Sequence, residues 1–307
     1  MTLRDKVEKL SLKNVIIAQR LKRMPTIIDK LKRYPDMNLS QMQDIGGLRV
    51  VVDSIKNVRE IEKSYKVQSK LSRFEHSLVR ERDYILTPRS EDGYRSLHLI
   101  YSYKNRVAPA YEGLMLELQI RTKLQHNWAT AVETMGIYLN QPLKSRLGEK
   151  EWIDFFALAS SAFAHKERLP LVPRFQNMTA GETYNAVAKA EKELQVLEKL
   201  TAFASVANII GKNRKNSFYH LITLDTEKKT VQLTSFAKSN FSVAQLAYAK
   251  AEARAIKGEK IEPVLVAAGS IDSLKRAYPN FFLNTTEFVS SVRKIISISA
   301  TGKQHPD

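Results

Sequence analysis

The sequence predicts a mixed α/β fold, with a sheet flanked by helices in the first half of the chain and a smaller α/β module after it. Three observations predict this class. Apolar and polar residues alternate along residues 114–122, which is the two-residue period of a strand. Longer amphipathic or apolar stretches, such as 124–139 and 151–167, are typical of helices. Strand signals and helix signals also follow one another along residues 1–168.

The composition is that of a globular protein with a substantial core. The chain has 307 residues, 43% of them hydrophobic and 26% charged, which is enough for one large domain or two ordinary ones. No apolar run reaches the roughly 18 residues of a membrane span, so we expect none. Charges are spread through the N-terminal residues, unlike a secretory signal. Cysteine is absent, which excludes disulfides and thiolate metal sites and is compatible with the cytoplasmic location that we expect.

The strongest bulk feature is a net charge of +17, from 49 Lys and Arg residues against 32 Asp and Glu residues. Such a field attracts polyanions, among them nucleotides, RNA, DNA and acidic lipids. A protein that is simply basic would show the same balance. The charge therefore does not decide between an enzyme that acts on nucleotides and a protein that binds RNA.

The elements of the first half are justified in chain order. Residues 15–23 predict a strand, and Pro25 suits the first turn of the helix that follows, because its missing N–H has no partner there anyway. A β-branched run predicts a strand at 46–54, and a helix is expected over 58–70. The remaining elements are strands at 83–86, 94–103 and 114–122 and helices at 124–139 and 151–167.

The second half begins after a segment with little periodicity. Residues 168–182 contain two prolines and a glycine, so we expect a linker there and domains at 1–168 and 169–307. A long helix is expected over 183–210, ending near Gly211. The following elements are a hairpin over 217–237, a helix at 243–257, a strand at 262–269 and two further helical pieces.

Four basic residues lie in the first predicted strand and the helix after it. Arg20 and Lys22 are two apart and share one face of the strand. Lys30 and Arg33 are three apart and share one face of the helix. Together they could converge on a triphosphate. A solvated basic surface is the alternative interpretation.

A carboxylate precedes the next strand. Asp44 lies just before Gly46 and Gly47, which allow the backbone to pass close to a neighbour. A carboxylate at the lip of a sheet is a natural ligand for Mg²⁺, which prefers oxygen donors and keeps several waters. Arg49 follows, and its guanidinium plane can stack on a nucleobase. Neither a GxxxxGK[ST] loop nor a GxGxxG turn is present in the chain.

A turn-rich segment leads into a tyrosine, an arginine and a histidine. It contains Gly93 and leads into Tyr94, Arg95 and His98. A tyrosine beside a glycine at the entrance of a strand can stack on a purine. The alternative is an ordinary loop aromatic that packs on its own hairpin.

The strand at 114–122 carries a polar face. Glu117, Gln119 and Arg121 alternate there with leucine and isoleucine. Glu117 could be a second carboxylate, on Mg²⁺ or near a hydroxyl to be activated, and the other two could bind a base edge or a phosphate. His126, on the next predicted helix, is either part of this site or a structural histidine, and Trp128 is expected in the core. A half-solvated antiparallel strand is the alternative for the whole stretch.

Taken in series, "DIGGLR", "GYRSLH" and "ELQIRT", preceded by an RxK strand and "PTIIDKLKR", resemble the synthetase domain of the RelA/SpoT family of alarmone synthetases. The resemblance covers about residues 14–140. It implies a mixed sheet flanked by helices and related to nucleotidyltransferases. It also implies transfer of the β,γ-pyrophosphate of ATP to a ribose 3′-hydroxyl, usually of GDP or GTP.

The resemblance further implies roles for individual residues. Asp44 and Glu117 would hold Mg²⁺, and Glu117 would also activate the 3′-hydroxyl. Tyr94 would stack on the acceptor base. ATP would be bound by Arg20 and Arg49 at the adenine and by Lys22, Lys30 and Arg33 at the phosphates. The acceptor side would comprise Arg89, Tyr94, Arg95, His98, Gln119, Arg121 and His126.

Departures from the family pattern leave several possibilities open. Arg89 stands where the family commonly has lysine, and no His-Asp dipeptide occurs, so we expect no alarmone hydrolysis. Three functions remain: a pyrophosphokinase making a (p)ppGpp-type alarmone, a toxin that pyrophosphorylates the 3′-CCA end of tRNA, and a non-catalytic nucleotide- or RNA-binding module. The second half is expected to be a regulatory or interaction domain that acts through a second subunit or a neutralising protein partner. A domain that only stabilises the first one is the alternative.

Overall fold

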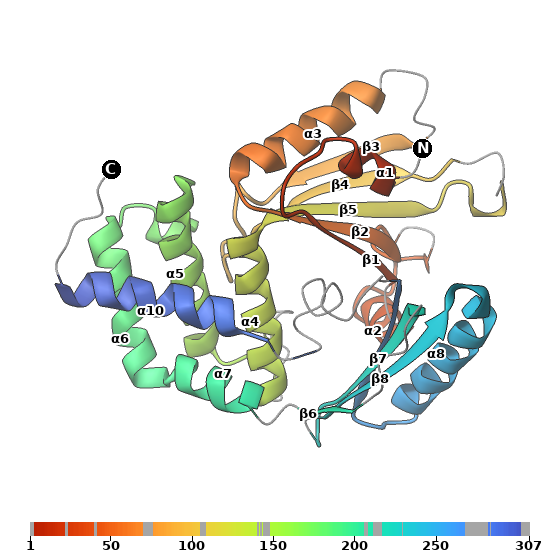
Figure 1. Cartoon of the computed structure of the whole chain (residues 1–307). Helices are drawn as coiled ribbons and strands as arrows, with labels where there is room; N and C mark the ends of the chain where they lie inside the picture. The colour runs from red at the N-terminus through yellow and green to blue at the C-terminus, as the bar shows by residue number, and fades with distance from the viewer. Residues whose placement is uncertain are drawn as a thin grey trace. The chain divides into compact units, whose positions relative to one another are not determined.

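The computed structural model describes residues 3–21, 24–39, 42–69, 76–104, 109–139, 141, 143, 148–205, 208–210, 217–228, 230–267, 282 and 284–301 (Figure 1). The chain divides into two compact units, each built from segments that are distant in sequence. Unit 1 comprises Met1–Arg82, His98–Ile120 and Ala207–Phe282, and unit 2 comprises Asp83–Leu97, Arg121–Val206 and Leu283–Asp307. This division differs from the linear boundary expected near residue 168, because residues on both sides of that position pack into each unit.

Unit 1 contains a five-stranded sheet in the order β1-β2-β5-β4-β3. Its strands are β1 (Ile16–Leu21), β2 (Gly46–Val52), β3 (Ser77–Asp83), β4 (Leu97–Ser102) and β5 (Met115–Thr122). The valines at 50–52 of β2 are buried without alternation, as expected of an inner strand covered on both faces. Three helices accompany the sheet: α1 (Leu3–Glu8), α2 (Met24–Arg33) and α3 (Ile55–Ser69).

Helix α3 covers one face of this sheet (Figure 1). Val58, Ile61 and Tyr65 are fully buried. They lie three and four residues apart, which places them on one stripe of the helix. The mixed α/β class expected for the first half is therefore confirmed, with strands and helices at most of the expected positions.

Unit 1 also contains a four-stranded sheet from the second half of the chain, in the order β6-β8-β7-β9. Its elements are β6 (Asn208–Ile210), β7 (Ser217–Asp225), β8 (Thr230–Ala237), β9 (Ile261–Ala267) and helix α8 (Phe241–Ile256). The expected hairpin is confirmed as β7 and β8, with Asp225 opposite Thr230. The Asp225 carboxylate accepts hydrogen bonds from the backbone N–H groups of Glu227 and Lys228, which stabilises the turn. Strand β9 lies against β1, and α8 contacts α2.

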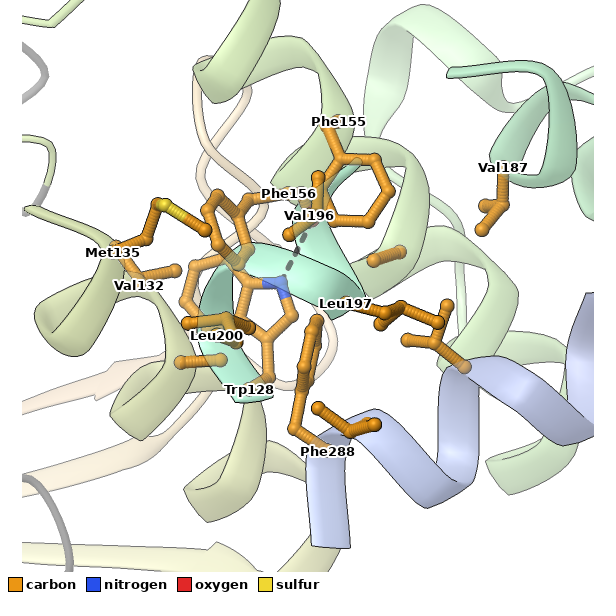
Figure 2. Packing of buried hydrophobic residues seen from close by; sticks show 14 of the residues in the cluster. Trp128, Val132, Met135, Phe155, Phe156, Val187, Val196, Leu197, Leu200 and Phe288 are labelled. Carbon is orange, nitrogen blue, oxygen red and sulfur yellow. Dashed lines mark hydrogen bonds between the residues drawn. The ribbon is translucent and has the colours of Figure 1, made fainter. Parts of the chain in front are cut away.

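Unit 2 is a helical assembly around one aromatic core (Figure 2). Its helices are α4 (Lys123–Leu139), α5 (Lys150–Glu167), α6 (Ala180–Leu194), α7 (Val196–Ser205) and α10 (Thr286–Thr301). Trp128 lies in this core as expected, and its Nε1–H donates to the backbone oxygen of Phe156 at 2.7 Å. Phe288 brings the last helix into contact with Phe156 and Phe163.

The prediction of one long helix over 183–210 is wrong. It is two helices, α6 and α7, separated by Gln195, which has a left-handed backbone with φ of 52°. The change of direction buries Val196, Leu197 and Leu200 in the core of unit 2. Helical periodicity on both sides of a single left-handed residue hides such a break. After α7 the chain forms β6 at 208–210 instead of a further helical turn.

The prediction of a strand at 83–86 is also wrong, because β3 ends at Asp83 and a turn follows. The Asp83 carboxylate accepts from the backbone N–H groups of Ile85 and Leu86, and this local pairing replaces the ladder of a strand. Of the two late helical pieces, α10 is described and residues 268–281 lie outside the described part of the chain.

The segment expected as a linker packs inside unit 2. Val172 is fully buried, and its N–H donates to the Ser161 hydroxyl on α5. Thr179 and Glu182 then form a capping box at the start of α6. Within the described residues, no helix is both long and apolar enough to cross a membrane.

Candidate active site

The predicted site contains two carboxylates of unit 1. Asp44 is half-buried just before β2, and its Oδ1 is 3.0 Å from the Lys30 ammonium on α2. Glu117 is on β5, with its Oε1 2.7 Å from His98 Nδ1 on the neighbouring strand β4. Gln119 Nε2 donates to the other oxygen of Glu117 at 2.6 Å. The side chains of His98 and Gln119 therefore hold the two oxygens of the Glu117 carboxylate in place.

These neighbours change the pKa of Glu117. Burial on its own raises this pKa, but the hydrogen bond and the charge of His98, together with the hydrogen bond from Gln119, lower it below its ordinary value. Glu117 is thus ionised at neutral pH. The charge of Asp44 acts in the opposite direction and raises the pKa of Glu117. The two acids therefore affect each other electrostatically.

A glycine lets the two strands that carry these acids approach closely. A Cβ added at Gly47 would stand 2.8 Å from the backbone oxygen of Glu117 and 3.9 Å from its Cβ. Real Cβ atoms essentially never approach other atoms closer than 3.0 Å. Glycine at this position of β2 therefore positions β5, and with it Glu117, against the strand that follows Asp44.

Positions 20 and 49, whose arginines are predicted to bind adenine, lie on one face of the sheet by their backbone register. Arg20 pairs with Gly47 and Ala18 pairs with Arg49 in the antiparallel ladder of β1 and β2, so positions 20 and 49 are diagonal neighbours. Arg49 is 9% exposed, and its buried Nε makes no hydrogen bond to the described residues. Lys22 and the side chains of Arg20 and Arg33 lie outside the described part of the chain.

In unit 2, the predicted acceptor tyrosine already has an arginine over its ring. The Arg89 guanidinium carbon lies 4.5 Å from the Tyr94 ring centroid. Arg89 also forms a two-bond ion pair with Asp92, whose side chain is 4% exposed. Tyr94 packs further against Tyr84 and against Trp128 of the core. Asp92 was missed from the sequence, and its i,i+3 spacing from Arg89 was the available signal.

Arg95 is built into the structure of unit 2. It is 3% exposed, and its three guanidinium nitrogens donate to Ser160 Oγ at 3.0 Å, to the Ile85 carbonyl at 2.9 Å and to the Pro170 carbonyl at 2.7 Å. Burial lowers the pKa of Arg95 to about 10, while the charge of Glu167 opposes that shift. Its donors hold the turn and the segment after α5, and its contact with an acceptor stays a prediction.

Arg121 and His126 are both 3% exposed and hydrogen-bonded to each other through Nη2 and Nδ1. Because a guanidinium can only donate, Nδ1 accepts and the histidine proton is on Nε2. The helix α4 that carries His126 begins with a reciprocal cap, in which Thr122 and Gln125 exchange backbone and side-chain hydrogen bonds. His126 is thus buried against Arg121 of β5, and its place beside an acceptor stays a prediction.

The predicted residues therefore fall into two groups. Unit 1 brings together Lys30, Asp44, His98, Glu117 and Gln119, with Arg49 on the same strand as Gly47. Unit 2 contains Arg89, Tyr94, Arg95, Arg121 and His126. Within the described ranges, no cluster of three or more His, Cys, Asp or Glu side chains is arranged to hold a metal ion.

Comparisons with known proteins agree with the motifs. Residues 19–142 match the sequence profile of the region found in RelA / SpoT proteins. Over 125 residues the chain is 34% identical to the GTP pyrophosphokinase YjbM of Bacillus subtilis (strain 168), covering 39% of this chain and 55% of that protein. Over 136 residues it is 30% identical to the GTP pyrophosphokinase YwaC of the same organism, covering 43% and 62%. The matched segments thus span little more than half of either relative.

The chain is also similar to two solved structures. The small alarmone synthetase 1 of Bacillus subtilis bound to its product pppGpp is 25% identical, with a TM-score of 0.41, over 53% of this chain and 82% of that one. The small alarmone synthetase 2 of the same organism is 25% identical, with a TM-score of 0.43, over 54% and 84%. The resemblance to the RelA/SpoT family, stated from the motifs, is confirmed for residues 19–142 by the sequence profile.

Proposed function

We propose, from the premise that residues 19–142 are a RelA/SpoT synthetase region, that this chain is a pyrophosphokinase that transfers the β,γ-pyrophosphate of ATP to the ribose 3′-hydroxyl of GDP or GTP. The observation that carries the proposal is the pair of acids in unit 1. Asp44 and Glu117 affect each other electrostatically, and Lys30 lies 3.0 Å from the first of them. The two relatives named as GTP pyrophosphokinases support the same reaction.

The reaction needs positioning and charge stabilisation more than covalent help. The acceptor 3′-oxygen forms a bond to the β-phosphorus of ATP, and the bond from that phosphorus to the oxygen bridging to the α-phosphorus breaks. AMP leaves with the electron pair, and the hydroxyl proton passes to the Glu117 carboxylate. Glu117 suits this role because its lowered pKa keeps it ionised and His98 and Gln119 hold both its oxygens in place.

A divalent cation fits the two acids. Asp44 and Glu117 would hold Mg²⁺, since both are carboxylates of unit 1 and Mg²⁺ prefers oxygen donors. Two carboxylates suit Mg²⁺ better than a metal that requires a full set of protein ligands, because Mg²⁺ keeps waters and substrate phosphates in its shell. The ion, when bound, would neutralise charge on the phosphates. Lys30 and Arg49 are the described cations that we assign to ATP, at the phosphates and at the adenine.

A second candidate acceptor is the 3′-CCA end of tRNA, for which the net charge of +17 is the favourable observation. Polyanion binding is dominated by phosphate neutralisation, so a basic protein has an advantage there. A module that only binds nucleotides is disfavoured, since binding phosphates gives no reason to keep two acids that repel each other. We further propose that β6–β9 with α8 regulate the reaction, through a second copy or a protein partner, and that it takes place in the cytoplasm.

The test uses the full chain with γ-labelled ATP, offered GDP, GTP, ATP and total tRNA in parallel. A labelled product of GDP or GTP supports the proposal, and a labelled product of ATP supports a pyrophosphokinase with another acceptor. Label on tRNA supports the second candidate, and no labelled product of any of them refutes an enzyme. Glu117→Gln should lower the transfer rate about 10²- to 10⁴-fold, the usual contribution of a general base. Glu198→Gln, at an exposed position of α7, is the matched control and should transfer normally. Transfer by Glu117→Gln at near the wild-type rate would remove Glu117 from its role.

A further inference from the structure

Helix α8 of unit 1 has an outer face that carries exposed apolar residues. The helix packs on β7 and β9 (Figure 1), and Ala244 and Ala251 are among its buried residues. Val243 and Leu246 are instead 53% and 58% exposed. Single exposed apolar side chains are ordinary, but several on one face mark an interaction surface. The outer face of α8 is therefore a candidate docking surface.

The exposed residues repeat with the spacing of a helix–helix contact. They lie alternately three and four residues apart, along α8 and the residue that follows it: Val243, Leu246, Lys250, Ala253 and Lys257. This heptad spacing places them on one stripe, as in a helix that packs against a second helix. These five residues are called the α8 stripe below.

The acids of α8 are occupied by other partners and leave the stripe positively charged. Glu252 is 9% exposed and accepts from the Tyr248 hydroxyl at 2.5 Å. Glu259, just after the helix, accepts three hydrogen bonds from Arg254, at 2.9, 3.0 and 2.6 Å. Lys250 forms no ion pair among the residues that the structure describes. The stripe is thus apolar at its start and cationic further along.

We propose that the α8 stripe is the docking surface for an acidic amphipathic helix of a protein partner. Apolar residues of that helix would lie opposite Val243 and Leu246, and carboxylates opposite Lys250 and Lys257. A second copy of the chain fits less well, because two antiparallel stripes centred on Lys250 would bring like charges together. An anionic membrane also fits less well, since a helix lying on a membrane carries its cations on the polar face and not within the apolar stripe.

The position of α8 gives such a partner a route to the proposed reaction. Within unit 1, α8 contacts α2, the helix whose Lys30 pairs with Asp44. A partner that shifted α8 would therefore act on the helix that carries a residue assigned to ATP. Most of the net charge of +17 belongs to unit 1, which attracts an acidic partner. The inference rests on the regulatory role proposed for β6–β9 and α8, and it names the surface and the class of partner.

Binding of two synthetic helical peptides to the full chain, without nucleotide, tests the proposal. Both peptides carry leucine along one stripe, with glutamate in one peptide and lysine in the other at the remaining positions of that stripe. We expect the Kd of the glutamate peptide to be at least about tenfold lower than that of the lysine peptide at low salt, and the difference to shrink at high salt.

Two variants locate the binding on the stripe. Leu246→Gln should raise the Kd of the glutamate peptide about tenfold, because it removes the apolar contact. Lys250→Glu should reverse the preference between the two peptides. Val79→Gln on β3 and Lys63→Glu on α3, at exposed positions of unit 1, are the matched controls and should bind like the wild type. All four variants should keep the wild-type thermal unfolding midpoint.

Several results would overturn the inference. They include no binding of the glutamate peptide, equal binding of both peptides, and binding that Leu246→Gln leaves unchanged. Self-association of the wild type that Leu246→Gln abolishes would assign the stripe to a second copy. Binding to vesicles of anionic phospholipid that the same variant abolishes would assign it to a membrane.

The peptide assay is independent of the transfer assay. A chain that binds the glutamate peptide as expected but transfers no label refutes the proposed reaction alone. A chain that labels GDP but does not bind the glutamate peptide refutes only the docking surface.

Discussion

Replacing Gly47 by alanine should misplace Glu117, the proposed catalytic carboxylate, without removing it. The added Cβ would lie 2.8 Å from the Glu117 carbonyl oxygen, while ordinary van der Waals contact begins at 3.4 Å. The neighbour is backbone and not the end of a flexible side chain, so β2 and β5 must separate by about 0.6 Å, the difference between these distances. Neighbouring strands are normally about 4.8 Å apart, so such a shift strains the ladder. Overpacking of this kind costs about 1–3 kcal/mol.

The consequence for transfer is larger than the consequence for stability. A misplacement of about 1 Å can cost about 10²-fold in rate, so a shift of just over half that size should lower transfer by roughly tenfold or more. The assay is label transfer from γ-labelled ATP to GDP, with urea unfolding measured on the same samples. Gly181→Ala is the control, because a Cβ there meets nothing within 4 Å. If Gly47→Ala transferred and unfolded like Gly181→Ala, the argument that glycine positions Glu117 would be refuted.

Two further predictions concern stability. Trp128→Phe removes the buried hydrogen bond to the Phe156 carbonyl, and it should lower the free energy of unfolding by about 1–3 kcal/mol; a change below about 0.5 kcal/mol in urea unfolding would contradict this. Burial on its own raises the pKa of Glu62. The hydrogen bonds and charges of Lys66 and Arg59 lower it by more, so the net pKa lies below 4.5. This carboxylate therefore stabilises the fold fully above pH 4.5, and the contribution is lost as the pH falls through the lower folded value. Glu62→Gln should cost about 1 kcal/mol at neutral pH and nothing near pH 2, and an equal cost at both would contradict the assignment.

Local patterns in the sequence predicted much of the fold and part of the site. On β5, Leu118 and Ile120 are fully buried while Glu117 and Gln119 are half-buried on the other face, as the alternation indicated. The expected hairpin is confirmed. It could be predicted because hydrogen bonds between residues close in sequence stabilise its turn. The break at Gln195 was not predicted, since a single left-handed residue leaves the apolar period on both sides unchanged.

The partners of the charged residues could not be predicted, because they come from positions far apart in the chain. Arg95 donates to Ser160 and Pro170, 65 and 75 residues away, and no local pattern indicates these partners. His98 was expected beside an acceptor, and it lies 2.7 Å from Glu117 on the adjacent strand. A motif indicates that such residues occur together, but the packing of the elements decides which atoms they contact.

By itself, the sequence determined the alternation of strands and helices, the positions of the motifs and the family that residues 19–142 resemble, because each depends on residue types and spacing along the chain. Only the tertiary structure decided that the two compact units are each assembled from three separate segments. It also decided that Asp44 and Glu117 share one electrostatic environment, while Arg89 is neutralised by Asp92. The physical reason is that burial and charge pairing act through space, between groups that the chain order keeps apart.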